Sequence, residues 1–229
     1  QFEGYGDLEE FDWEGHRERY GDIHRLDRIL EAEGDSPNRY KVSKQADVLM
    51  LFFLLSHEEL SGLFSRLGYE FDGDTIARNV DYYLKRTSHG STLSRVVHSW
   101  VLARTDRQRS WDLFCEALRS DVADIQGGTT HEGIHLGAMA GTVDLAARCY
   151  TGLETRRGVL RFNPRLPEEM EDVEFSIRYR RHWINVSLSA DELVLSSRRH
   201  DVPPIRVAVA GRTRTLESGA SLRFELDGS

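Results

Sequence analysis

The chain has 229 residues, of which 39% are hydrophobic and 30% are charged, a composition typical of a folded protein rather than a disordered one. A net charge of −8 argues against nucleic acid and against an anionic membrane surface as partners, because both require a basic face. Cys115 and Cys149 belong to no CxxC pair, which favours a reducing compartment and argues against a disulfide framework or a zinc site.

The chain also carries no visible signal peptide or membrane segment. Its longest apolar run, Val48 to Leu55, is far shorter than the roughly 20 residues that span a bilayer. We therefore expect a cytoplasmic protein. The sequence opens at Gln1 without an initiator methionine, and we interpret it as a piece of a longer polypeptide.

The first part of the chain predicts helices. Residues 1–40 are expected to be loop with a short helical piece at 22–32, and residues 43–56 are apolar almost all round, as in a helix buried on every side. Apolar residues at Leu93, Val96, Val97, Trp100 and Val101 follow the helical period and predict an amphipathic helix. Further helices are predicted at 57–67, 73–85, 106–120 and 129–150.

The period changes to two after Gly152. Apolar and polar residues alternate at 173–179, 184–188, 205–209 and 222–226, which predicts strands with one buried face. We expect a small antiparallel β-sandwich over residues 153–229, after a helical domain over residues 1–152. The charge differs between the two regions, with 17 basic and 27 acidic residues before position 156 and 13 basic and 11 acidic residues from position 156 onward.

Lys44, Gln45 and Asp47 form the first polar cluster (residues 44–47, the Lys44 cluster), at the start of the apolar segment. Polar groups in such a position need partners, and a sugar could supply them, since Lys donates hydrogen bonds and Gln both donates and accepts. The alternative is a solvated first turn, with Ser43 as its cap and Asp47 near the positive end of the helix dipole. Composition alone favours this alternative.

The second cluster is Thr-Ser-His-Gly-Ser-Thr at residues 87–92 (the His89 loop), directly before the amphipathic helix. Hydroxyl groups, a glycine that permits close approach and a helix N-terminus together make an anion site. His89 could donate a hydrogen bond or add positive charge. The alternative is a glycine-containing loop in which Ser91 is an ordinary N-cap.

The third cluster spans residues 129–135. Thr129 and Glu132 have the spacing of a capping box, which we favour over a role for Glu132 as general base, while His135 could line a pocket. His131 and His135 are four residues apart, but Gly133 between them is unfavourable in mid-helix, and we predict no metal site.

In this order, the three clusters resemble glycoside hydrolase family 65, the maltose, trehalose and kojibiose phosphorylases and their hydrolytic relatives. Lys44 to Val48 is similar to the family's Lys-Gln-Ala-Asp run, and Ser88 to Ser94 is similar to its His-Gly-Ser-Ser-Leu-Ser phosphate loop. Residues 129–141 resemble its Glu-Gly-Ile-His helix, and residues 1–5 resemble the stretch that enters this region.

The resemblance implies that residues 1–152 are the later helical hairpins of an (α/α)6 catalytic barrel, followed by a C-terminal β-sandwich at 153–229. Lys44 and Gln45 would bind the transferred glucose. His89, Gly90, Ser91 and Thr92 would hold inorganic phosphate, the co-substrate, with no metal or other cofactor. Phosphate would attack the anomeric carbon and invert it, so that an α-linked glucose disaccharide gives β-glucose 1-phosphate and glucose.

The resemblance also implies what this chain lacks. The family's general acid is a Glu in a Gly-Pro-Asp-Glu-Tyr segment that does not occur here, so we expect it upstream, in the missing N-terminal part of the same enzyme, and assign no catalytic residue. Related enzymes are often dimers, which leaves a homodimer open. A trehalase-like hydrolase is the alternative activity, but the His89 loop carries no carboxylate and so favours phosphorolysis. A non-catalytic carbohydrate-binding module built on the sandwich is the third alternative.

Overall fold

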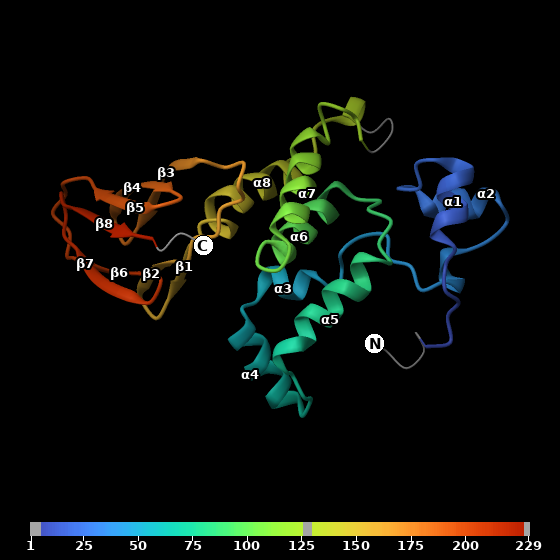
Figure 1. Ribbon diagram of the computed structural model, residues 1–229, viewed down its shortest axis with the longest axis horizontal. Helices are drawn as coiled ribbons and strands as arrows, with labels where there is room; N and C mark the ends of the chain where they lie inside the picture. Colours follow the sequence, from blue (N-terminus) through green and yellow to red (C-terminus); the bar gives the residue numbers. More distant parts are fainter. Residues whose placement is uncertain (1–5, 126–129, 227–229) are drawn as a thin grey trace. The chain divides into compact units, whose positions relative to one another are not determined.

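The computed structural model describes residues 6–125 and 130–226, apart from the side chain of Glu132. The chain divides into two compact units, residues 1–142 (the helical unit) and residues 143–229 (the sandwich unit) (Figure 1). No helix within these described ranges combines the length and the apolar character that crossing a membrane requires.

The helical unit contains short and medium helices joined by loops. Four of them begin at a polar cap: Asp12 accepts a backbone hydrogen bond ahead of α1, Ser56 and Glu59 form a capping box ahead of α4, Asp72 precedes α5, and Asp106 accepts a backbone hydrogen bond ahead of α7. The helices are α1 (Trp13–Tyr20), α2 (Leu26–Ala32), α3 (Met50–Leu54), α4 (His57–Leu67), α5 (Gly73–Leu84), α6 (Thr92–Leu102), α7 (Arg107–Arg119) and α8 (Leu136–Asp144), with single turns at Pro37–Arg39 and Thr130–Glu132 and a π-helical turn at Leu145–Cys149.

The main core of the helical unit lies between α3, α5, α6 and α7. Leu49 and Val97 are almost completely buried there, and Val80 of α5 and Leu113 of α7 pack against them. A smaller core joins Phe11 to Leu26 and Leu30 of α2, which fixes the α1–α2 segment.

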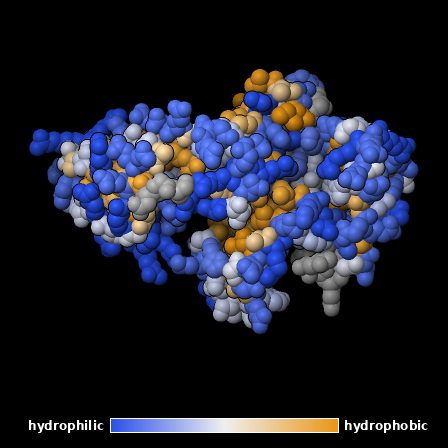
Figure 2. Space-filling view, in the orientation of Figure 1, coloured by the Kyte–Doolittle hydropathy of each residue, from blue (hydrophilic) through white to orange (hydrophobic). Residues whose placement is uncertain are grey.

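The predicted buried helix at 43–56 is wrong in its length and in its burial. Only Met50–Leu54 is α-helical, none of its residues is fully buried, and the side chains of Leu51 and Leu54 are 43% and 66% exposed. The reason is that Ser43 forms a β-bridge with Thr87, which keeps the start of the segment extended rather than helical. Apolar surface is visible over the middle of the helical unit in Figure 2.

The predicted long helix at 129–150 is wrong in its start, although α8 and the π-helical turn that follows it confirm its end. A turn at Thr130–Glu132 is followed by Gly133 with a φ of 128°, and α8 begins only at Leu136. The carboxylate of Asp121 accepts the backbone N–H of His135 at 2.9 Å, which satisfies one of the donors that open the new helix. Thr129 lies outside the described residues, and so does the Glu132 side chain, so the capping box predicted there stays a prediction.

The sandwich unit consists of two four-stranded sheets, ordered β1-β2-β6-β7 and β3-β4-β5-β8 (Figure 1). Inward side chains of both sheets form one core, which includes Phe162, Ile184, Leu195 and Val207. The strands are β1 (Glu154–Arg156), β2 (Val159–Phe162), β3 (Asp172–Tyr179), β4 (His182–Ser189), β5 (Glu192–Ser197), β6 (Ile205–Val209), β7 (Arg212–Leu216) and β8 (Ser221–Glu225).

One expectation for the sandwich needs correction. It is not purely antiparallel, because β2 and β6 pair in parallel, with Leu160 opposite Val207. The long connection between these strands passes through the other sheet, which makes the parallel alignment possible. Along β4, His182 and Ile184 point inward, so Trp183 between them points outward and is 40% exposed.

Candidate functional site

The Lys44 cluster and the His89 loop lie directly beside each other. The N–H of Ser88 donates to the carbonyl of Ser43 at 2.9 Å, and the N–H of Gly90 donates to the carbonyl of Lys44 at 2.8 Å. These bonds continue the bridge between Ser43 and Thr87. Two clusters separated by about 40 residues in the sequence therefore form a single double-stranded bend at the N-terminal end of α6.

Gly90 is required by this close approach. A Cβ atom at position 90 would lie 2.7 Å from the carbonyl oxygen of His24 and 3.0 Å from Cγ of Lys44. The first contact is with backbone, which cannot swing away as a side chain can. The glycine thus permits three chain segments to meet at the bend.

The two sugar-binding candidates of the Lys44 cluster are exposed and make local bonds. Nζ of Lys44 pairs with Oδ2 of Asp27 at 2.9 Å, and Nε2 of Gln45 donates to Oδ1 of Asp47 at 2.9 Å. Partial burial works to raise the pKa of Asp27, but the hydrogen bond and the charge of Lys44 outweigh it and keep that pKa below its usual value. Asp27 therefore stays ionised and holds the Lys44 ammonium in place.

Ser91 occupies the N-cap position of α6, as the simpler interpretation expects, but its side chain makes no capping hydrogen bond. Its backbone is extended, with φ −139° and ψ 137°, and its carbonyl accepts the N–H of Ser94 at 3.1 Å. Thr92 opens the helix and is 6% exposed. The first turn of α6 thus offers backbone N–H groups that its own cap does not satisfy.

His89 is held by a relay of side chains behind the loop. Nδ1 of His89 lies 3.0 Å from Oγ of Ser94, and Nδ1 of His98 lies 2.8 Å from the carbonyl of Ser94. A carbonyl can only accept, so the proton of His98 is on Nδ1. The Ser94 hydroxyl is then able to donate to Nδ1 of His89, and in that tautomer the His89 proton is on Nε2.

His89 is neutral in this setting. Burial, with further contributions from the nearby charges of His98 and Arg95, lowers the pKa of His89 to about 3. Burial also lowers the pKa of His98. Of the two roles considered for His89 in the sequence, donation of a hydrogen bond fits this pKa and added positive charge does not.

Arg95 lies beneath the loop and is 1% exposed. Its Nε donates to Oε2 of Glu116 at 2.9 Å, and its Nη2 lies 3.0 Å from Nε2 of His24. Because a guanidinium can only donate, Nε2 of His24 is the acceptor. Within the described part of the chain, Nη1 of Arg95 and Nε2 of His98 are buried without a hydrogen-bond partner.

The sequence did not single out Arg95, His98 or His24. The helical period predicts that the polar side of α6 faces solvent, whereas the structure buries Ser94, Arg95 and His98 as deeply as Val96. A polar face that is buried is a signal of a site, but only the fold reveals the burial.

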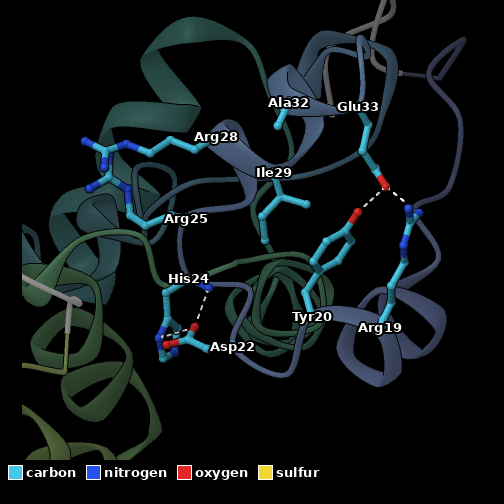
Figure 3. Close-up of a pocket in the computed structure, with 9 residues that line it drawn as sticks. All are labelled: Arg19, Tyr20, Asp22, His24, Arg25, Arg28, Ile29, Ala32 and Glu33. Atoms are coloured by element: carbon cyan, nitrogen blue, oxygen red, sulfur yellow. Dashed lines mark hydrogen bonds and ion pairs between the residues drawn. The ribbon is translucent and has the colours of Figure 1, made fainter.

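Two cavities share the lining residues Asp22 and His24, and the smaller one reaches the bend. The smaller, about 370 Å³, is lined by residues that include Trp13, Ile23, Thr87, Ser88 and His89. The larger, about 780 Å³, lies against α1 and α2 (Figure 3). Asp22 and His24 line both cavities, whereas Lys44, Gln45, Gly90, Ser91 and Thr92 line neither of them.

Asp22 and His24 form the wall between the two cavities. Oδ1 of Asp22 accepts the backbone N–H of His24 at 2.8 Å and lies 2.8 Å from the ring nitrogen Nδ1. Nδ1 itself makes no aligned hydrogen bond, so this second contact is electrostatic. The wall is therefore held from one side by Asp22 and from the other by Arg95.

The hydrogen bonds of the third cluster are made with residues outside this network. Nδ1 of His135 lies 2.5 Å from Oδ1 of Asp121, and this hydrogen bond lowers the pKa of Asp121 against the opposing effect of burial. His131 and His135 do not share a helix, because Thr130–Glu132 is a separate turn that ends before α8 begins.

Comparisons with known proteins agree with the resemblance of the clusters. Residues 1–144 match the family model for the glycosyl hydrolase family 65 central catalytic domain, and residues 153–216 match the one for its C-terminal domain. The chain therefore belongs to glycosyl hydrolase family 65.

Similar proteins are found at several levels of identity. An uncharacterized glycosyl hydrolase of Mycobacterium tuberculosis is 54% identical over 97% of this chain and 17% of its own length. Trehalose 6-phosphate phosphorylase of Lactococcus lactis is 38% identical over 99% of this chain and 29% of its own length. The solved structure of a protein assigned as a kojibiose phosphorylase from the human microbiome has a TM-score of 0.76 at 23% identity, covering 99% of this chain and 30% of its own.

The chain thus spans less than a third of the length of each of these relatives. The likeness to the solved structure establishes the order of the fold, with helices followed by sheets that are mostly antiparallel. The expected general acid remains a prediction about sequence upstream of Gln1.

Proposed function

We propose that the chain is the C-terminal part of an inverting phosphorylase that cleaves an α-linked glucose disaccharide with inorganic phosphate. The observation that carries the proposal is the 2.8 Å hydrogen bond from Gly90 to Lys44, which supports one site made from both clusters. The helical unit would then contribute hairpins to an (α/α)6 barrel whose remaining helices come from the rest of the polypeptide.

In the proposed site, His89, Gly90, Ser91 and Thr92 face the phosphate, and Lys44 and Gln45 face the glucose. The first-turn N–H groups of α6 and the Ser91 hydroxyl donate to an anion, and neutral His89 donates from Nε2. Gly90 contributes by its lack of a side chain, because its N–H is already bonded to Lys44.

The proposed reaction is a single displacement. A phosphate oxygen attacks the anomeric carbon, the bond from that carbon to the bridging oxygen breaks, and the upstream carboxylic acid protonates the departing sugar. The products are β-glucose 1-phosphate and a free sugar. We propose that phosphate is the only co-substrate and that no metal takes part.

The test is phosphate dependence in the full-length protein. Disaccharide cleavage is expected to require phosphate and to yield β-glucose 1-phosphate, detected by its anomeric proton signal. Equal rates with and without phosphate would identify a hydrolase instead, and sugar binding without any cleavage would identify a non-catalytic module.

The loop itself is tested by Ser91→Ala and His89→Ala. Each removes one donor to the anion, and the KM for phosphate is expected to rise about tenfold, in keeping with 1.5–3 kcal/mol for a charge-assisted hydrogen bond. Ser65→Ala, in α4, is the matched control. A phosphate KM that does not change in both loop variants would remove the loop from the site.

A further inference from the structure

The His89 loop offers hydrogen-bond donors to an anion but no positive charge. Ser91 and Thr92 contribute hydroxyl groups, and His89 is neutral because burial lowers its pKa to about 3. The ammonium group of Lys44 is already paired with Asp27 at 2.9 Å. Anions in proteins are held most strongly by hydrogen bonds together with a cation, so a cation that serves this loop has to lie behind it.

Arg95 is a cation in that position. It follows the N-cap residue Ser91 by four residues, which is about one turn of α6, and only 1% of its surface is exposed. A guanidinium group keeps its charge at every pH at which proteins are folded. A charge removed from water in this way is unfavourable unless its surroundings balance it.

The balance around Arg95 is incomplete. Its Nε donates to Glu116 at 2.9 Å, but the side chain of Glu116 is 52% exposed, so water screens the carboxylate far more than the guanidinium. Nε2 of His24 accepts from Nη2 at 3.0 Å and adds a hydrogen bond without a charge. Nη1 has no partner in the part of the chain that the structure describes. The buried guanidinium therefore leaves a positive potential around itself.

This potential reaches the His89 loop. Burial is the largest cause of the lowered pKa of His89, and the positive charges of His98 and then Arg95 come next. Arg109, an exposed residue of α7, contributes less than Arg95. A positive charge that disfavours a proton on His89 favours a negative ion at the same place.

Arg95 is also fixed relative to the loop through His24. The ring of His24 accepts from Arg95, and the backbone carbonyl of His24 lies where a Cβ atom at position 90 would approach it to 2.7 Å. Gly90 in turn donates its N–H to Lys44 at 2.8 Å. The charge of Arg95 is thus held at a set place behind the bend, by bonds to two other segments of the chain.

We propose that Arg95 is a positioning residue for inorganic phosphate, whose buried charge attracts the ion to the His89 loop from behind. This inference rests on the proposed phosphorylase function and assigns the cation of its phosphate site. The competing explanation is that Arg95 only joins α6 to Glu116 of α7. A joining role requires the bonds of Arg95, whereas a role in phosphate binding requires its charge.

The experiment measures two KM values in the full-length protein, one for inorganic phosphate and one for whichever of maltose, trehalose and kojibiose is cleaved fastest. Arg95→Gln, which removes the charge, is expected to raise the phosphate KM at least tenfold, or about 1.4 kcal/mol, and to change the sugar KM less than about twofold. Arg95→Lys keeps the charge and should restore most of the phosphate affinity. Arg78→Gln removes an equal charge from the exposed side of α5 and should change neither KM.

Glu116→Gln separates the two explanations by the sign of its effect. The Gln oxygen can still accept from Nε of Arg95, so the bond is kept and only the opposing charge is lost. The phosphate KM is expected to fall about twofold, a small effect because the Glu116 side chain is half exposed. A phosphate KM that does not fall in Glu116→Gln would overturn the inference, as would an Arg95→Lys variant as impaired as Arg95→Gln. If Arg95→Gln does not fold, Glu116→Gln decides alone.

A second measurement does not depend on turnover and separates this inference from the proposed function. Binding of inorganic phosphate to the same full-length proteins is followed by calorimetry, and Arg95→Gln should bind it at least tenfold more weakly than the wild type. If that loss is found but cleavage does not require phosphate, the role of Arg95 stands and the phosphorylase proposal falls. If cleavage requires phosphate but Arg95→Gln binds it as tightly as the wild type, the phosphorylase proposal stands and the inference falls.

Discussion

The two units bury histidine in opposite ways. His182 in the sandwich unit is fully buried, and both of its ring nitrogens are bonded, Nδ1 to Oγ of Ser197 at 2.8 Å and Nε2 to the carbonyl of Pro203 at 2.9 Å. His98 in the helical unit is equally buried, but its Nε2 has no partner among the described residues. An unpartnered buried polar atom is costly, so its presence beneath the His89 loop is best explained by function.

The same contrast holds for apolar groups. In the sandwich strands, the inward side chains close into one core and Trp183 is the large apolar side chain that is exposed among those described. In the helical unit, Leu54 is 66% exposed, Leu67 is 61% exposed and Val122 is 91% exposed. The sandwich is complete by itself, whereas the helical unit has surfaces suited to further protein.

The largest expected effect is on folding of the separate units. Residues 143–229 expressed alone are expected to fold and to unfold cooperatively on heating, because their core is closed. Residues 1–142 alone are expected to aggregate or to unfold without a cooperative transition, because their apolar surface is uncovered. Circular dichroism melts and size-exclusion chromatography provide the measurement. A well-folded monomer of residues 1–142 would contradict the comparison.

The two histidines provide a sharper test of intermediate size. His182→Leu leaves two former partners unsatisfied and is expected to cost about 2–4 kcal/mol in urea unfolding of residues 143–229. His98→Leu is expected to lower the free energy of unfolding by only about 1 kcal/mol, since one ring nitrogen has no bond to lose. The same variant is expected to raise the phosphate KM of the full-length protein several-fold, because His89 is no longer held in position.

His182→Leu serves as the control for the kinetic effect and should leave the phosphate KM unchanged. Replacement of His98 by Asn, whose amide can donate to the carbonyl of Ser94, is expected to restore part of the phosphate affinity. If both leucine variants change only stability, the relay behind the loop is structural.

The last expected effect concerns acid. Because burial lowers the pKa of His89 to about 3, the unfolded chain binds a proton below its ordinary pKa, near 6.5, that the folded chain does not. Stability should therefore fall as the pH drops from about 6.5 toward 3, and be fully retained above that range. The fall should be shallower in His89→Gln than in the wild type, measured by urea midpoints at several pH values. Ser91→Ala, which removes no titrating group, should follow the wild type.

The parts of the fold that the sequence predicted well are those with local signals. The helix at His57–Leu67 is confirmed to the residue, because a capping box begins it and Gly68 in a left-handed conformation ends it. The strands β3 and β4 are also confirmed, because their alternation is strict. β7 was missed because four of its five residues are exposed and polar, so it has no apolar alternation.

The site was predictable only as separate pieces. Sequence identified the Lys44 cluster and the His89 loop, but it could not indicate that their backbones pair, because that pairing joins distant segments. It also could not indicate that Arg95 and His98 are buried beneath the loop, because that burial is visible only in the fold. The role of the loop residues as phosphate ligands remains a proposal.

The bonds from Ser88 and Gly90 to the other strand of the bend have a further consequence for binding affinity. If a bound sugar makes one strand more rigid, the partner strand loses conformational entropy as well. Phosphate that binds second then has a smaller entropy loss to overcome. By thermodynamic reciprocity, binding of either molecule must then raise the affinity for the other by the same factor. Backbone pairing in the bend thus gives rise to positive cooperativity between the two co-substrates.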